Sequence, residues 1–290
     1  MSIIEKAIRR TMEAEAAKGV SMAAAPRGQG KVASLSTLTR GNHVVDLQSE
    51  EMRTAGLLPP DDKARIRRNE FRSIKSPLLV AAAAHLTAHP EQRASVAVVV
   101  SSLPGEGKTY ISLNLASSLA FECDVTTVII DGDVARHKLS SLLGVHDLPG
   151  FSDYLANEKL TLSDVMLPTN EPSVFVMPAG KWREDIAELI ASTRMRALIE
   201  GISQAAERPL IILDCPPLLV TSEAAALMAV ADQTLFVVRA GHSHQSTVEE
   251  AAAKLDRSKP IHVVLNAWQP MSIAERVYYS KYRDYYGNPE

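Results

Sequence analysis

Residues 102–109, Ser-Leu-Pro-Gly-Glu-Gly-Lys-Thr, have the composition of a loop that binds phosphate groups. Glycines let backbone N–H groups approach phosphate oxygens, and the helical pattern that starts at Tyr110 adds the partial positive charge of a helix N-terminus. Lys108 would reach the β- and γ-phosphates, and Thr109 would offer its hydroxyl to Mg²⁺. The loop therefore predicts that the chain binds ATP and transfers or hydrolyses its terminal phosphate.

One position departs from the phosphate-loop pattern G-x-x-x-x-G-K-[ST], because its first glycine is Ser102 here. Serine is small enough for the loop to close, and the alternative is an ordinary glycine-rich turn between a strand and a helix. Glu106 is expected to project into solvent or toward a neighbouring subunit. The loop residues expected to bind the nucleotide are Ser102, Pro104, Gly105, Glu106, Gly107, Lys108, Thr109 and Tyr110.

Acidic residues end two further apolar runs of the sequence. Asp131 and Asp133 follow one run, and Asp214 follows the other. Carboxylates at strand ends beside a phosphate loop are placed to hold Mg²⁺ or its waters and to orient a nucleophile. Each acid alone could be a turn or a helix cap, but three strand-end motifs together favour a nucleotide site. Cys215 has no nearby histidine to activate it, so we expect a small buried residue there.

The elements that must position these residues are short apolar strands separated by helical patterns. Such strands form a parallel sheet that helices cover on both faces, and these sheets bind ligands at the carboxyl ends of their strands. The fold class is therefore α/β, with a mostly parallel sheet flanked by helices. Strands are expected at residues 96–100, 126–130, 174–177, 210–213, 235–238 and 261–265. Helices are expected at residues 110–120, 185–202, 222–231 and 247–255, and around residues 70–75.

Composition narrows the possible functions. The chain has 290 residues, 46% of them apolar, which suits one α/β domain with tails. A net charge of −3 argues against a dedicated nucleic-acid binder. Cys123 and Cys215 form no C-x-x-C pair, and the histidines complete no metal set and are expected on the surface. Without a signal peptide or an apolar run of membrane-spanning length, we expect a cytoplasmic protein whose membrane link comes through a partner.

Four segments follow from the pattern along the chain. An amphipathic helix is predicted for residues 1–17, a flexible linker for residues 18–43, and the α/β domain for residues 44–270. Residues 271–290 are predicted to be an accessible tail without a strand or helix period. This tail contains Tyr278, Tyr279, Tyr282, Tyr285 and Tyr286. These tyrosines are candidate phosphoacceptors. Alternatively, the aromatic and basic residues of the tail form a surface that binds a membrane or nucleic acid, or they pack against the domain.

The three strand-end motifs together resemble those of the bacterial tyrosine kinases. These kinases carry a Walker A loop, a Walker A′ of the form D-x-D and a Walker B that ends D-x-P-P, found here at residues 102–109, 131–133 and 214–217. The nearest branch contains cytoplasmic autokinases of exopolysaccharide gene clusters, including those that accompany exosortase systems. The resemblance covers nearly the whole chain beyond the linker. Further matches are residues 46–79, 133–136, 177–180 and 221–224.

This resemblance implies a P-loop fold related to the septum-positioning and partition ATPases, and transfer of the ATP γ-phosphate to protein tyrosines. It assigns the phosphate contacts to Lys108 and Thr109. It assigns Mg²⁺ to Thr109, Asp133 and Asp214, and the role of base for the tyrosine hydroxyl to Asp131. The catalytic residues so implied are Lys108, Asp131, Asp133 and Asp214.

The chain departs from the family pattern after D-x-D and in the oligomerisation helix. Ala135 and His137 replace an arginine and a proline, while Arg136 keeps the second arginine and is a candidate contact to phosphate or to a neighbouring subunit. Related folds place an Asn after the last strand to read the adenine edge, so Asn266 has this role or is an ordinary turn residue. The E-x-x-R-x-x-R pattern of the oligomerisation helix is represented by Asn69, Arg72 and Lys75.

The resemblance also implies partners. Family members without transmembrane helices work with a separate membrane co-polymerase that sets polysaccharide chain length. Tail tyrosines are phosphorylated in trans within a homo-oligomer, which added phosphates would loosen by repulsion. The resemblance also implies a tyrosine phosphatase as a partner, and it implies no nucleic-acid partner. The membrane co-polymerase implies that the chain associates peripherally with the inner membrane.

Two other functions stay open on the sequence alone. A partition- or septum-type ATPase would use water as the phosphate acceptor, and a nucleotide-binding scaffold would mainly gate a membrane partner. The ATPases carry a signature lysine followed by glycine where this chain has Leu103 and Pro104. These two residues and the tyrosine-rich tail favour an ATP-dependent tyrosine autokinase that regulates exopolysaccharide chain length, polymerisation and export.

Overall fold

The computed structural model describes residues 34–39, 42–54, 56–57 and 64–268. The predicted N-terminal helix, most of the predicted linker and the tyrosine-rich tail lie outside these residues, so the predictions for them stay untested.

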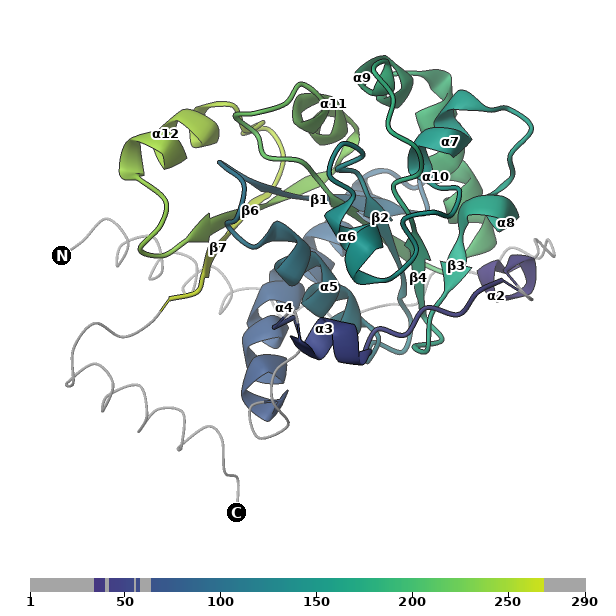
Figure 1. Cartoon of the computed structure of the whole chain (residues 1–290), viewed down its shortest axis with the longest axis horizontal. Helices are drawn as coiled ribbons and strands as arrows, with labels where there is room; N and C mark the ends of the chain where they lie inside the picture. The colour runs from purple at the N-terminus through teal and green to yellow at the C-terminus, as the bar shows by residue number, and fades with distance from the viewer. Residues whose placement is uncertain (1–33, 40–41, 55, 58–63, 269–290) are drawn as a thin grey trace. The chain divides into compact units, whose positions relative to one another are not determined.

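A seven-stranded sheet forms the centre of the described chain, in the order β3-β4-β2-β5-β1-β6-β7 (Figure 1). Its neighbouring strands are parallel except for the pair β3–β4, which confirms the prediction of a mostly parallel sheet. The two-residue strand β3 is too short to produce a pattern in the sequence. The strands are β1 (Ser95–Ser101), β2 (Thr126–Asp131), β3 (Leu167–Pro168), β4 (Val174–Met177), β5 (Pro209–Asp214), β6 (Gln233–Arg239) and β7 (Ile261–Asn266).

Helices connect the strands and differ from the prediction in one long segment. The helix expected over residues 185–202 is two helices, because the Ser192 hydroxyl accepts a hydrogen bond from the backbone N–H of Arg194 (3.2 Å) and so starts a new helix. The helices are α2 (Leu35–Leu38), α3 (Glu50–Thr54), α4 (Ala64–Ala88), α5 (Lys108–Leu119), α6 (Lys138–Leu142), α7 (Phe151–Ala156), α8 (Leu162–Val165), α9 (Ile186–Ile190), α10 (Thr193–Ala205), α11 (Glu223–Val230) and α12 (Gln245–Ala253).

Successive side chains of each strand point to opposite faces of the sheet, so the sheet has one apolar core on each face. In β1, Val98 and Val100 belong to a cluster that contains buried residues of α7, α9, α10 and α11. Ala97 and Val99 point the other way and belong to a cluster with buried residues of α4 and α5. Figure 1 shows these two helix layers on opposite sides of the sheet. Strands β1, β2, β4 and β5 are therefore buried on both faces, as their continuous apolar sequences predict. The edge strand β7 instead leaves Val263 and Leu265 exposed.

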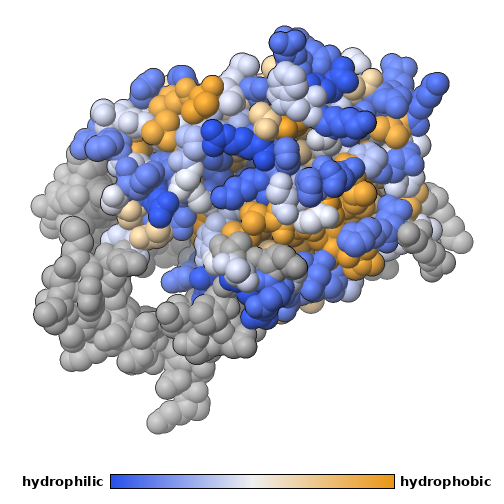
Figure 2. Space-filling model, in the orientation of Figure 1, coloured by the Kyte–Doolittle hydropathy of each residue, from blue (hydrophilic) through white to orange (hydrophobic). Residues whose placement is uncertain are grey.

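Packed structure begins before residue 44, where the sequence predicts a flexible linker. Leu35 of α2 is 2% exposed, and the Asn42 side-chain amide donates hydrogen bonds to the backbone carbonyls of Ser163 (2.8 Å) and Met166 (2.9 Å). The short α2 gives too little helical pattern to be separated from a linker. Val44, in the segment that leads to α3, is exposed. Figure 2 shows apolar side chains on the molecular face around α6 and this segment.

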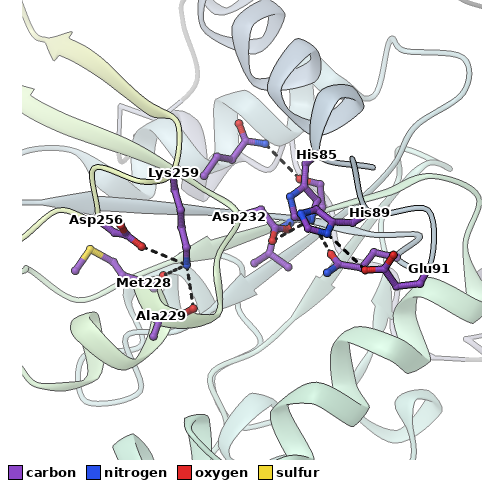
Figure 3. Close-up of polar contacts among 12 residues, drawn as sticks. His85, His89, Glu91, Met228, Ala229, Asp232, Asp256 and Lys259 are labelled. Carbon is purple, nitrogen blue, oxygen red and sulfur yellow. Dashed lines mark hydrogen bonds and ion pairs between the residues drawn. The ribbon is translucent and has the colours of Figure 1, made fainter. Parts of the chain in front are cut away.

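A polar cluster closes the amino ends of the strands, at the edge of the sheet opposite the carboxyl ends (Figure 3). The Asp232 carboxylate accepts the backbone N–H of Val96 (2.7 Å) and pairs with His85 (3.2 Å). The Lys259 ammonium donates to the carbonyl of Ala229 (3.0 Å) near the end of α11, a favourable place for a cation. The expectation that the histidines lie on the surface holds only in part for His85, whose side chain is 19% exposed and helps to join α4 to the sheet.

Candidate active site

The phosphate loop connects the end of β1 to the start of α5, as the sequence predicts. Gly107 precedes the helix with φ at +102°, a left-handed conformation that L side chains rarely adopt. A Cβ atom on this glycine would lie 2.0 Å from the side-chain nitrogen of Asn266. The left-handed backbone conformation therefore favours glycine at this position, and an added side chain would also displace the Asn266 amide.

Substituting Gly107→Ala is expected to lower the affinity for ATP more than tenfold, because the methyl group strains the left-handed turn and displaces the Asn266 amide from the loop. Nucleotide binding measured by calorimetry tests this. Gly144→Ala is the matched control, because Gly144 has φ at +68° with no atom within 4 Å of its added Cβ. Equal losses of affinity in the two variants would show that the contact at Gly107 has no part in nucleotide binding.

Lys108 starts α5 and directs its ammonium into the site. Its side chain is largely buried, and its Nζ atom donates to the hydroxyl of Ser101 at 3.0 Å. Burial lowers the pKa of Lys108, while the carboxylates of Asp214 and Asp133 act in the opposite direction. The predicted phosphate lysine and two predicted metal-binding acids are thus electrostatic neighbours.

Asp131 and Asp214 lie opposite each other at the ends of β2 and β5. The Asp131 carboxylate is fully buried, and one of its oxygens accepts both the backbone N–H (2.8 Å) and the hydroxyl (2.6 Å) of Ser140. Burial is the main cause that raises the pKa of Asp131 to about 7, and Asp214 adds to it. A carboxyl with such a pKa exchanges its proton near neutral pH, which suits a general base.

Asp214 is held by two residues of α5. It accepts hydrogen bonds from the hydroxyls of Ser112 (3.1 Å) and Thr109. Burial raises its pKa to about 6, against the effects of Lys108 and these hydroxyls. Asp133 is partly buried, and burial raises its pKa as well. Sheet pairing and α5 together bring the predicted residues Lys108, Thr109, Asp131, Asp133 and Asp214 to one edge of the sheet.

The donors in this site suit Mg²⁺ bound together with phosphates. Within the described residues, no three His, Cys, Asp or Glu side chains form a group that could hold a metal by themselves. Magnesium is ordinarily bound through one or two carboxylates, substrate phosphates and waters, so Thr109, Asp133 and Asp214 supply an adequate donor set. The Ser102 hydroxyl is buried without a hydrogen-bond partner in the described structure, which leaves a donor in the loop for a ligand oxygen.

Four predicted contact residues have neighbours that the sequence did not indicate. Glu106 is 1% exposed and bound within the fold, so the expectation of a solvent- or subunit-facing acid is wrong. The Asn266 amide donates to the carbonyl of Glu106 at 2.9 Å. The ring of Tyr110 lies near the ring of Phe71 and the guanidinium of Arg67, both in α4. Its backbone N–H lies in the first turn of α5, where such groups have no partner within the helix. Arg136 is exposed beside Asp133.

Other residues of the site were missed by the sequence analysis. Ser112 lies one helical turn after Lys108, so its position on the same face of α5 was available from the spacing. Ser140 follows Asp131 by nine residues and has no such signal. Arg239 and Ser243 contact the phosphate loop from the connection after β6. The rule that strand carboxyl ends bind ligands points to this connection but not to these side chains. Cys215 is buried, as predicted, and burial raises its pKa.

Similarity to known proteins points to one family. No family model matches the chain. The tyrosine-protein kinase CpsD of Streptococcus agalactiae is 29% identical over 174 residues, which cover 59% of this chain and 74% of CpsD. The crystal structure of the VpsO kinase domain is 28% identical with a TM-score of 0.55, covering 69% of this chain and 98% of that domain. The chain is a relative of the bacterial tyrosine kinases.

The relationship to the bacterial tyrosine kinases confirms the resemblance drawn from the three motifs, and it supports a protein-tyrosine kinase. The wider fold prediction is confirmed too. The cell division ATPase MinD of Pyrococcus furiosus has a TM-score of 0.50 at 25% identity, covering 63% of this chain and 78% of MinD. The domain is therefore of the P-loop type shared with septum ATPases.

Two further observations concern the bacterial tyrosine kinase pattern. At the last position of the oligomerisation motif, the Lys75 ammonium donates to the carbonyl of Ser118 (2.9 Å) and pairs with Glu122 (2.6 Å). Lys75 therefore joins α4 to α5 within the domain, whereas Arg72 is exposed.

In the portion of the chain that the structure describes, no helix has the length and apolar character needed to cross a membrane.

Proposed function

We propose that the chain is an ATP-dependent tyrosine autokinase whose acceptors are tyrosines of its own tail. The observation that carries the proposal is the meeting of Lys108, Asp131 and Asp214 at the carboxyl edge of a sheet related to tyrosine-kinase domains. The last 20 residues of the same chain contain five of its seven tyrosines. A candidate kinase site and a group of candidate acceptors therefore occur in one polypeptide.

Each residue has a separate task in the proposed transfer. Loop N–H groups and Lys108 bind the β- and γ-phosphates, and Asp131 accepts the proton of the tyrosine hydroxyl. The tyrosine oxygen forms a bond to the γ-phosphorus while the bond from that phosphorus to the bridging oxygen of ADP breaks. Thr109, Asp133 and Asp214 would hold Mg²⁺, which neutralises the charge of the phosphates when it is bound.

We further propose the cellular role that the resemblance implies. The kinase regulates exopolysaccharide chain length, polymerisation and export, together with a membrane co-polymerase that keeps this cytoplasmic chain at the inner membrane. A homo-oligomer allows transfer in trans, and a tyrosine phosphatase reverses it. Stimulation of phosphorylation by the cytoplasmic segment of a co-polymerase would support this role, and failure of every such segment to stimulate would contradict it.

Incubating the purified chain with Mg-ATP is expected to place phosphate on tyrosines of the peptide that contains residues 278–286. Mass spectrometry of that peptide locates the phosphate, and a parallel assay measures free phosphate. Release of phosphate with an unmodified tail would replace the kinase by an ATPase of the partition type. Absence of ATP turnover, even with a co-polymerase segment, would favour a nucleotide-binding scaffold.

A further inference from the structure

Glu106 is a buried carboxylate inside a loop that is built to bind anions. It is 1% exposed, and its two oxygens have different partners. One accepts the backbone N–H of Leu103 at 2.8 Å, and the other accepts the hydroxyl of Ser243. Leu103 belongs to the phosphate loop itself, whereas Ser243 lies between β6 and α12. A single side chain therefore closes the loop and joins it to a different connection.

Backbone carbonyls of the phosphate loop are bound from the same side. The carbonyl of Gly105 accepts the guanidinium of exposed Arg239 at 2.9 Å, and the carbonyl of Glu106 accepts the Asn266 amide at 2.9 Å. In a trans peptide the N–H group points opposite to the carbonyl. The N–H groups of Glu106 and Gly107 consequently point away from the connections after β6 and β7, in the orientation of an anion-binding nest.

We propose that Arg239 and Ser243 are positioning residues that hold the phosphate loop in its nucleotide-binding form, with Glu106 as the anchor inside the loop. The proposal rests on the proposed function, because it assigns these contacts to binding of ATP at the same site. The proposal assigns neither residue a contact with the nucleotide or the tyrosine. Both act on the direction of the loop N–H groups through the hydrogen bonds described above.

Nucleotide affinity, and not the chemical step, should change when these contacts are lost. Contacts that shape the loop are made equally in the ground state and the transition state, so losing them raises KM and leaves kcat unchanged. A loss of one such hydrogen bond is expected to weaken ATP binding about threefold to tenfold. A purely structural role would instead lower thermal stability and kcat together.

The experiment measures ATP affinity by calorimetry on the full chain for Ser243→Ala, Ser243→Thr and Arg239→Ala. The alanine variants are expected to bind ATP about threefold to tenfold more weakly, and Ser243→Thr should keep the affinity because it keeps the hydroxyl. Ser246→Ala, at an exposed serine in the first turn of α12, is the matched control. Because Arg239 is exposed, its variant tests the proposal even where another variant fails to fold.

A double-mutant cycle with Glu106→Ala completes the test. If Ser243 acts through Glu106, the double variant should bind ATP no more than about twofold worse than Glu106→Ala alone. Unchanged affinity in Ser243→Ala and Arg239→Ala, or fully additive losses in the cycle, would overturn the proposal. These outcomes differ from failure of the proposed function, in which the unsubstituted chain itself binds no ATP or binds it without phosphorylating tyrosine.

Discussion

Lys108→Met is expected to lower the rate of tyrosine phosphorylation by about 10² to 10³, as removal of a single charge-stabilising donor does in other active sites. Methionine is one atom shorter than lysine and keeps a similar unbranched apolar stem, but it cannot carry a charge. The ammonium lies at a buried point where Asp214 and Asp133 are close enough to influence its pKa. Its loss removes the positive charge that would face the terminal phosphates.

The same substitution also changes the two acids. Lys108 lowers the pKa of Asp214, so its removal lets the pKa of that carboxyl rise further above its present value of about 6. A carboxyl that is protonated at neutral pH binds Mg²⁺ poorly. We therefore expect weaker Mg-ATP binding in addition to the slower transfer, and both effects come from one charge.

Initial rates of phosphotyrosine formation at saturating Mg-ATP measure this effect, with thermal unfolding as a check that the variant is folded. Lys254→Met is the matched control, because Lys254 is exposed at the end of α12. It should leave the rate unchanged. A Lys108→Met variant that is folded and retains more than about a tenth of the rate would exclude Lys108 from the phosphate contacts.

The sequence was sufficient for the residues whose positions follow from local rules. A phosphate loop lies between a strand and a helix, and acids follow buried parallel strands, so Lys108, Asp131 and Asp214 could be placed at one edge without coordinates. Their meeting follows from strand order, since β5 pairs with β2 on one side and with β1 on the other. Periodicity and the loop and strand-end motifs therefore predict the fold class and the edge where the site lies, whereas the strand order that brings these residues together comes from the structure.

Residues that act through tertiary contacts could not be predicted in the same way. Glu106 is a charged residue in a glycine-rich loop, and one of the two contacts that hold it in the fold is with Ser243, 137 residues later. Ser140 has no motif that links it to Asp131, and the break between α9 and α10 depends on one capping hydroxyl. These contacts depend on the folded structure, and the local sequence pattern around each residue does not predict them.

Asp131→Asn is expected to abolish most of the kinase activity while making the metal-free, nucleotide-free protein more stable at pH 8. The carboxyl of Asp131 has a pKa of about 7 in the fold, above the value of 3.8 for an unperturbed aspartate. Between about pH 4 and pH 7, the folded state therefore binds more protons than the unfolded state. Its contribution to stability falls as the pH rises through this window, and the loss is complete above it.

Asparagine removes that loss and keeps most of the contacts. Its side-chain oxygen can accept the N–H and the hydroxyl of Ser140, as the Asp131 oxygen does now. One unit of pKa shift corresponds to about 1.4 kcal/mol, and after allowance for coupling to Asp214 we expect a gain of about 2 kcal/mol at pH 8. Loss of the general base should slow phosphorylation by about 10² to 10⁴.

Thermal unfolding in a chelator at several values between pH 4 and pH 8 tests the stability effect, and Asp124→Asn at an exposed turn is the control. The stability difference between Asp131→Asn and the unsubstituted chain should grow with pH and approach zero near pH 4. A difference in stability that does not vary with pH, or an asparagine variant that is less stable at pH 8, would show that the ionised carboxylate of Asp131 does not destabilise the fold. If Asp131→Asn is more stable and less active than the unsubstituted chain, Asp131 contributes to the reaction and lowers the stability of the fold.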